Sequence, residues 1–456
     1  MPGTSTPPHW EVTFDSEGDP DEAQRDALLK GVEDEAITDL VVFSHGWNNS
    51  PSTATILYDR FFSPFPSLLD GRGSTAKVGY AGVIWPSMRW TDEPIPDFAA
   101  EPDGAPPPDP DGAASFGGAG AGVGRTLPQG LGQETQAALD KAFPGHTDTI
   151  EKLAGLLEER PAESARLDEF FELAKSLTED GTEGVDNEGE AGRQPEMLMD
   201  DPDHVFGGFL PLLTRVGVQF PAADDDAASF DGLRGLWNGA REMLRQTTYY
   251  QMKQRSGLVG RQGLGPVLAR FQEDPRFSGL RVHLVGHSFG GRLVSFALKD
   301  LPDQGSCVHS VTLLQAAFSH FAFADRLPFD PANSGALRGA RDKVSGPIVA
   351  CFSVHDHAVG TFYPIASRLK GDDASGLDLV SRWGALGHDG IQGIDGVSTT
   401  PIGAVAAMAD GFAFPPKGYA NVDAASVVFR GGPPSGAHSD ICHPELASVV
   451  LAAGRI

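Results

Sequence analysis

The feature of this sequence that most restricts its fold is a glycine-framed serine placed between an apolar run and a helical pattern. The run from Val282 to Val285 predicts a buried strand, and the apolar spacing from Leu293 to Ala297 predicts an amphipathic helix. Between them lies the string Gly286-His287-Ser288-Phe289-Gly290. A tight strand-to-helix turn has room only for small residues two positions before and after its serine, which explains Gly286 and Gly290. We expect such a turn to strain Ser288 and to present its hydroxyl as a nucleophile at a helix N-terminus.

Other short apolar runs, each ended by a glycine, a proline or a polar residue, predict further strands. Their β-branched residues extend over the whole run, which is typical of strands buried on both faces of a parallel sheet. We expect strands at residues 39–44, 78–85, 281–285, 308–314 and 347–353. Helical apolar spacing predicts a long helix over 230–254 and a short one over 445–453. The fold class that follows is α/β, with a doubly wound, mostly parallel sheet.

Residues 91–225 differ in composition from the rest of the chain. Their first part is rich in Pro, Gly, Ala and Asp, which predicts a loop that cannot fold alone. From Asp148 to Asp203 there are 18 acidic and 5 basic residues, so this stretch carries about half of the net charge of −27. Inside it, the spacing at 150–157 and 167–177 predicts a helical hairpin with an acidic outer face. We interpret 91–225 as an insertion, either a lid or a solubilising excursion, in a core formed by 1–90 and 226–456.

A second motif lies about 240 residues before the serine. The strand predicted at 39–44 runs into His45-Gly46-Trp47-Asn48-Asn49. A tetrahedral acyl intermediate needs two backbone N–H donors for its oxyanion. One donor is the residue that follows the nucleophile, Phe289. The other should come from a neighbouring loop in which a small residue allows close approach, and Gly46 makes the N–H of Trp47 the best candidate.

Taken together, the glycine-framed serine and the His45-Gly46 loop resemble the α/β-hydrolase superfamily of serine esterases and lipases. The end of the strand around Trp85-Pro86 fits the same resemblance, which covers about 1–90 and 226–456 and leaves the insertion unmatched. The resemblance implies an α/β-hydrolase fold and a catalytic triad in the chain order Ser, acid, His. It places the acid after a late strand and the histidine on a loop near the C-terminus. It implies no cofactor and identifies no substrate.

The best candidate for the acid is Asp356, which follows the strand predicted at 347–353, because sites of α/β proteins lie at the carboxyl ends of strands. Asp325, after the preceding strand, is the alternative. The best candidate for the base is His438, on a loop between a strand expected at Ala425–Phe429 and the final helix. Two other histidines, His388 and His443, remain alternatives.

These residues predict a serine hydrolase that cleaves small-molecule or lipid-like carboxylic esters through an acyl-enzyme on Ser288, with neither metal nor cofactor. The strongly acidic composition argues against nucleic acid as a partner. We expect no transmembrane segment, and three cysteines without a signal peptide suggest the cytoplasm. Two other classes stay open. One is a non-catalytic scaffold that binds a basic partner through the acidic insertion, and the other is a cofactor-free C–C hydrolase or haloperoxidase-like enzyme.

Overall fold

The computed structural model describes most of the chain, and the site is built on one large sheet. The described residues are 6–90, 125–126, 130–178, 196–215, 218–219, 230–302, 306–359, 384–407, 412–431 and 436–456. Within them, eight parallel strands form a sheet in the order β1-β3-β2-β6-β7-β8-β10-β9. Their bounds are β1 His9–Thr13, β2 Asp39–Ser44, β3 Val78–Ile84, β6 Arg281–His287, β7 Val308–Leu314, β8 Pro347–Phe352, β9 Ser398–Pro401 and β10 Gly418–Asp423.

Helices cover both faces of this sheet, so the prediction of a doubly wound α/β fold is confirmed. On one face, α2 (Pro51–Phe62), α3 (Phe65–Gly71) and α15 (Pro444–Gly454) bury aromatic and aliphatic side chains. On the other face lie α1 (Glu22–Asp34), α9 (Gly265–Glu273) and α10 (Phe289–Phe296). The central strands β2, β6 and β7 are almost wholly buried, which explains why they are rich in apolar residues, although polar residues such as His283 and Ser310 are buried among them.

The five strands expected from the sequence are present, but the last strand was placed wrongly. Residues Ala425–Phe429 form a turn after β10, and the N–H groups of Val427 and Val428 both donate to the carbonyl of Ala424. The true strand, β10, has the mixed sequence GYANVD and was not expected. Strands β1 and β9 were also missed, because edge strands lack the continuous apolar run of central ones.

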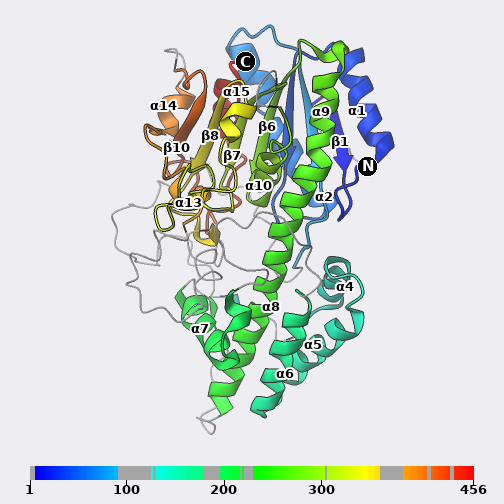
Figure 1. The fold of residues 1–456 in the computed structure, drawn as a ribbon, viewed down its shortest axis with the longest axis vertical. Helices are drawn as coiled ribbons and strands as arrows, with labels where there is room; N and C mark the ends of the chain where they lie inside the picture. The colour runs from blue at the N-terminus through cyan, green and yellow to red at the C-terminus, as the bar shows by residue number, and fades with distance from the viewer. Residues whose placement is uncertain are drawn as a thin grey trace.

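A group of helices outside the sheet forms what we call the helical region. It comprises α4 (Gln133–Ala142), α5 (Thr147–Glu159), α6 (Ser164–Ser176) and α7 (Pro202–Arg215). The predicted hairpin is present as α5 and α6, which bury Leu153, Leu157, Phe170 and Phe171. The long helix α8 (Phe230–Leu258) runs from this region to the sheet layers (Figure 1). The loop expected at the start of the insertion lies largely outside the described residues, as does most of the acidic stretch after 178.

Strand ends bring the chemistry to one edge of the sheet. Ser44, the last residue of β2, pairs in register with Gly286 of β6, and Leu313 of β7 pairs with the same glycine. The loops after β2, β6 and β8 therefore meet at their carboxyl ends. No helix in the described part of the chain is long and apolar enough to cross a membrane.

Candidate active site

Ser288 occupies a strained turn between β6 and α10. Its backbone has φ 55° and ψ −124°, a conformation that non-glycine residues rarely adopt. A Cβ atom on Gly286 would lie 2.4 Å from the carbonyl oxygen of Gly290, and one on Gly290 would lie 2.0 Å from that of Ser44. Both positions thus require glycine, as the sequence predicted. The strain and the close packing hold the hydroxyl of Ser288 at the edge of the sheet.

The hydroxyl of Ser288 belongs to a hydrogen-bonded chain of three side chains. Its Oγ lies 2.8 Å from Nε2 of His438, and Nδ1 of His438 lies 2.8 Å from Oδ2 of Asp356. The Asp356 side chain is fully buried, whereas that of His438 is 14% exposed. Since a carboxylate can only accept, Nδ1 carries the proton and Nε2 accepts the hydroxyl proton of Ser288. The structure therefore brings together the three residues that the sequence proposed as nucleophile, base and acid.

Backbone contacts fix the two loops that carry Asp356 and His438. The N–H of Val359 donates to Oδ1 of Asp356 at 3.2 Å, which leaves Oδ2 directed to the imidazole. The N–H of Ala437 donates to the carbonyl of His355 at 2.9 Å, so the two loops are joined directly. On the far side, Oδ2 of Asp440 accepts the N–H groups of Phe429 and Arg430. Hydrogen bonds at the residue before His438 and at Asp440 after it therefore fix the loop that carries this histidine.

The peptide between Gly46 and Trp47 lies against Ser288. A Cβ on Gly46 would be 2.5 Å from Cβ of Ser288 and 3.2 Å from its Oγ, so only glycine allows this approach. The carbonyl oxygen of Gly46 accepts hydrogen bonds from Nδ1 of His45 at 2.8 Å and from Nδ2 of Asn49 at 3.3 Å. In a trans peptide the N–H points opposite to the carbonyl. The N–H of Trp47 is thereby directed away from these donors.

Two backbone N–H groups beside Ser288, those of Trp47 and Phe289, have no backbone acceptor among the described residues. Phe289 is the first residue of α10, where helix geometry supplies no partner for its N–H. The N–H of Asn48, in contrast, donates to the carbonyl of Met88 at 3.2 Å. The geometry suits the predicted oxyanion donors Trp47 and Phe289.

His45 and His287 support this site from beneath, and the sequence analysis assigned a role to neither side chain. The ring of His45 stacks on Trp85 at 5.5 Å, and burial lowers its pKa to about 4. Nε2 of His287 donates to the carbonyl of His438 at 2.8 Å, and burial lowers the pKa of His287 to about 3. Both rings therefore stay neutral and act as fixed hydrogen-bond donors. The only sequence signal was their position beside Gly46 and Ser288.

The alternative site residues lie outside the chain of three. The side chain of Asp325 is 86% exposed and pairs with Arg338. His388, on the short helix α13 (Leu386–Asp389), bonds through Nδ1 to Asp389 at 2.7 Å. Burial opposes the charged form, but the hydrogen bond to Asp389 and the negative charges of Asp389 and Asp356 together outweigh it and raise the pKa of His388. His443 bonds to Asp440 at 2.7 Å.

Strained backbone is concentrated around this edge of the sheet. Six described non-glycine residues have positive φ, and three of them follow the strands that build the site: Asn48 after β2, Ser288 after β6 and Gln315 after β7. The other three, Ala36, Arg160 and Arg455, lie at the C-terminal ends of helices, where this conformation is common. Strain outside helix ends thus marks the candidate site.

The described residues contain no group of three or more His, Cys, Asp or Glu side chains that could hold a metal ion. The chain matches no protein-family model, no curated protein and no solved structure. What the site can do chemically therefore has to be argued from its geometry. The fold and the site define an α/β protein in which a serine, a histidine and an aspartate form a hydrogen-bonded chain beside two backbone N–H groups that have no described backbone acceptor.

Proposed function

We propose that this protein is a serine hydrolase of the α/β-hydrolase type that cleaves carboxylic esters through an acyl-enzyme on Ser288. The observation that carries the proposal is the hydrogen-bonded chain from Oγ of Ser288 through His438 to the buried carboxylate of Asp356. The strained turn at Ser288 and the all-parallel sheet support the same assignment.

Acylation follows from the protonation state of this chain. Nε2 of His438 takes the proton of Ser288 while Oγ forms a bond to the ester carbonyl carbon. The carbonyl oxygen becomes an oxyanion, which the N–H groups of Trp47 and Phe289 stabilise. When the intermediate collapses, the bond to the alkoxy oxygen breaks, and that oxygen leaves as an alcohol with the proton from His438. Asp356 stabilises the charged imidazole and keeps its Nδ1 protonated.

Deacylation uses the same groups with water in place of the serine. His438 accepts a proton from the water as its oxygen attacks the acyl carbon, and then returns that proton to Oγ of Ser288. The neutral state of His287 favours this cycle, because a second charge 4.9 Å from the ring of His438 would oppose its protonation. The clamp formed by His45 and Asn49 keeps the Trp47 N–H in place throughout, so no reorganisation is needed in the transition state.

The same residues argue against one of the two alternatives and leave the other open. A non-catalytic scaffold has no use for a serine held in strained backbone next to two N–H groups without acceptors. A C–C hydrolase or a haloperoxidase-like enzyme would use the same three side chains on a different substrate. These enzymes therefore have to be distinguished by assays with different substrates.

The proposal is tested with p-nitrophenyl esters of increasing acyl length and with a fluorophosphonate probe. We expect ester hydrolysis by the full chain, and phosphonylation of Ser288 located by mass spectrometry of the peptide that contains it. The variant Ser288→Ala should show neither. Absence of both reactions in the folded wild-type chain would overturn the proposal. Labelling of Ser288 without ester hydrolysis would favour the C–C hydrolase alternative.

A further inference from the structure

One turn of α8 packs on the side chains of both oxyanion residues. The ring of Tyr249 lies 5.6 Å from the ring of Trp47 and 4.7 Å from that of Phe289. One turn earlier, the guanidinium of Arg245 lies 5.0 Å above the Trp47 ring. The rings of Trp47 and Phe289 are themselves 6.5 Å apart. The loop after β2 and the first residue of α10 therefore share a contact with one helix.

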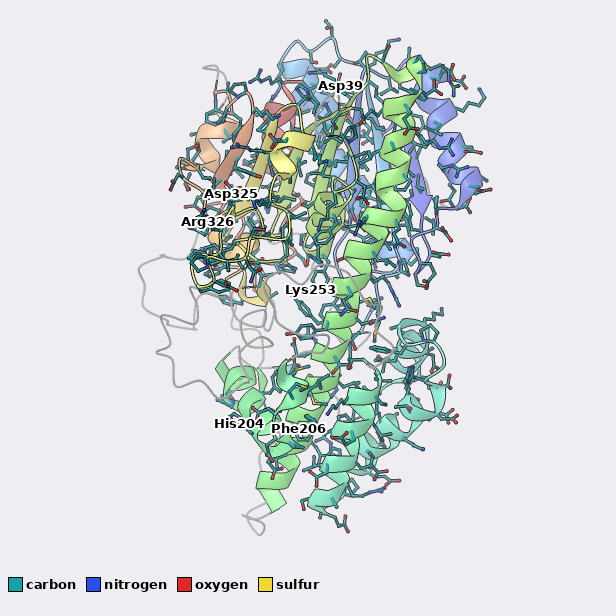
Figure 2. The ribbon with its side chains drawn as sticks, viewed as in Figure 1. Asp39, His204, Phe206, Lys253, Asp325 and Arg326 are labelled. Carbon is teal, nitrogen blue, oxygen red and sulfur yellow. The ribbon has the colours of Figure 1, made fainter. Side chains whose placement is uncertain are left out.

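The preceding turns of α8 are held in the helical region. The indole N–H of Trp237 donates to the carbonyl of Pro161 at 3.0 Å, and its ring lies edge-on to Phe170 at 5.8 Å. At Gly239 the backbones of α7 and α8 touch, because a Cβ there would lie 2.0 Å from the carbonyl oxygen of Phe206. Figure 2 shows Phe206 in the helical region and Lys253 farther along α8, toward the sheet.

The helix is continuous between these two sets of contacts. Gly239 and Tyr249 are ten residues apart on α8, a distance of about 15 Å along an α-helix. A second link lies at the other end, where Arg255 donates to the carbonyl of Pro86 after β3 and to that of Ala142 at the end of α4. One helix thus contacts both the helical region and the residues around Ser288.

We propose that α8 couples the helical region to the oxyanion hole, with Tyr249 and Arg245 as positioning residues for Trp47 and Phe289. The inference rests on the proposed function, since it assigns a means of control to the same site. An oxyanion hole acts on the transition state and not on the bound substrate. A change in the packing of the helical region should therefore alter kcat and leave KM nearly unchanged.

The contact near the site is tested with two tyrosines that are neighbours on α8. Tyr249→Ala removes the ring that contacts both Trp47 and Phe289. Tyr250→Ala removes an equally large, buried ring at the next position of the same helix, which contacts Tyr249 edge-on at 6.0 Å. We expect Tyr249→Ala to lower kcat on the order of 10- to 100-fold at nearly constant KM, as small misplacements of catalytic groups do. Tyr250→Ala should keep kcat within about threefold of wild type, because an exchange away from the transition state leaves its stabilisation intact.

Two further measurements separate positioning from general loss of structure. Tyr249→Phe keeps the ring and should restore kcat. The affinity for a trifluoromethyl ketone, whose adduct places an oxyanion in the hole, should fall in parallel with kcat in Tyr249→Ala. Equal losses in Tyr249→Ala and Tyr250→Ala, or an effect on KM alone, would overturn the positioning role.

The distant contact is tested with two glycines at the interface between α7 and α8. Gly239→Ala forces the helices apart at Phe206, whereas a Cβ on Gly207 would meet only Leu236 at an ordinary 3.9 Å. Coupling predicts a lower kcat in Gly239→Ala and an unchanged kcat in Gly207→Ala. Trp237→Phe, which removes the bond to Pro161 and keeps a ring, should lower kcat in the same direction and serves if Gly239→Ala does not fold. Wild-type kcat in folded Gly239→Ala or Trp237→Phe would overturn the coupling.

These outcomes are distinct from failure of the proposed function. An inactive wild-type chain that does not react with the fluorophosphonate contradicts the function itself. An active wild type, combined with a wild-type kcat in Tyr249→Ala, contradicts only the inference about α8.

Discussion

A second hydrogen-bonded Ser–His–Asp chain lies near the amino ends of the strands, at the end of the sheet opposite to Ser288. Oγ of Ser310 in β7 is 2.9 Å from Nδ1 of His283 in β6, and Nε2 of His283 is 3.0 Å from Oδ1 of Asp39 at the start of β2. Figure 2 shows Asp39 at the end of the sheet remote from the helical region. In both chains a hydroxyl donates to a neutral imidazole that donates to a carboxylate, although the two ring nitrogens exchange roles.

The two chains differ in their backbone and in their access to a substrate. Ser310 lies within β7 beside a register shift in the pairing of β6 with β7, pairs with His283 and is fully buried, with a negative φ like the rest of its strand. Ser288 lies in a strained turn beside two N–H groups that have no described backbone acceptor. The carboxylate of Asp39 is shared with Arg281 at 2.5 Å, so it is not reserved for the imidazole.

The comparison shows that side-chain types and distances do not define a hydrolase site. A nucleophile also needs an exposed approach, donors for the oxyanion and a base free to become charged. The chain at Ser288 combines the two N–H groups with a base whose side chain is 14% exposed, whereas the side chain of His283 is fully buried. We therefore propose that the chain at Ser310 stabilises the fold, and the following exchanges separate the two roles.

The largest expected difference is between the two serines. Ser288→Ala should lower kcat/KM on the order of 10³-fold or more, because it removes the atom that forms the acyl bond, while unfolding stays close to that of wild type. Ser310→Ala should keep activity and lose about 1–3 kcal/mol of stability, since it leaves a buried ring nitrogen without its donor. Ester kinetics and urea denaturation of both variants measure this. Retention of more than a tenth of the activity in Ser288→Ala would contradict the assigned nucleophile.

The histidines should divide in the same way. His438→Ala should cost nearly as much activity as Ser288→Ala, and the double variant should be barely worse than either, because residues that act as a unit are not additive. His283→Ala should instead lower stability by about 3 kcal/mol, since it breaks a buried polar pair. His388→Ala is the control with a mild effect on rate. If His388→Ala were the inactive variant, the loop that carries the base would have been misassigned.

A smaller effect is expected from two glycines, each of which touches one of the chains. Gly46→Ala places a Cβ 2.5 Å from that of Ser288 and displaces the Trp47 N–H, so kcat should fall by about 10²-fold, as for loss of an oxyanion donor. Gly454→Ala places a Cβ 2.8 Å from Nδ1 of His283 and should lower thermal stability without changing kcat. Equal kcat values in the two variants would contradict the proposal that the loop after β2 binds the oxyanion.

The serine turn and the central strands could be predicted because their determinants are local. Gly286 is required by contacts within the turn itself, and the buried parallel strands contain short apolar runs such as Val41–Phe43. Gly290 is required instead by the carbonyl groups of Ser44 and His45 after β2, a contact that the local sequence does not show. The position after a late strand and the resemblance to α/β-hydrolases then favoured Asp356 and His438 over Asp325 and His388, and the structure brings these two within 2.8 Å of each other. Their catalytic roles remain predictions until the variants are measured.

The support around the site could not be predicted, because it depends on contacts between distant segments. Nothing in the sequence separates His45 and Asn49, which hold the Gly46 carbonyl, from other polar loop residues. Tyr249 lies in the predicted helix 230–254. The packing of that helix was already explained by its apolar stripe, so nothing in the sequence distinguished Tyr249 from the other residues of the helix. The apolar run at Ala425–Phe429 misled the strand prediction, because its backbone is bound by Asp440 and by a turn instead of by a neighbouring strand.

The smallest expected effect is on the pH dependence of stability. Burial lowers the pKa of His283, against the opposing charge of Asp39, and Arg281 nearby acts in the same direction as burial. The folded chain therefore keeps His283 neutral, while the unfolded chain binds a proton below its ordinary value of about 6.5. The stabilisation is complete above that pH and is lost as the pH falls. His45 and His287 contribute with the same sign.

The contribution of His283 is isolated by His283→Gln, which cannot take up a proton in either state. Between about pH 6.5 and 5, the free energy of unfolding should fall less steeply in the variant than in wild type, by at most about 1.4 kcal/mol per pH unit for one proton. The exchange also acts on its neighbours, because His283 contributes to the lowered pKa of Asp39 and of His309, whereas the ion pair between Arg281 and Asp39 is retained. Urea denaturation at several pH values provides the slopes. Identical slopes would mean that His283 binds a proton in the folded state. The imidazole of the chain at Ser310 could then become charged, as the mechanism requires of the imidazole in the chain at Ser288.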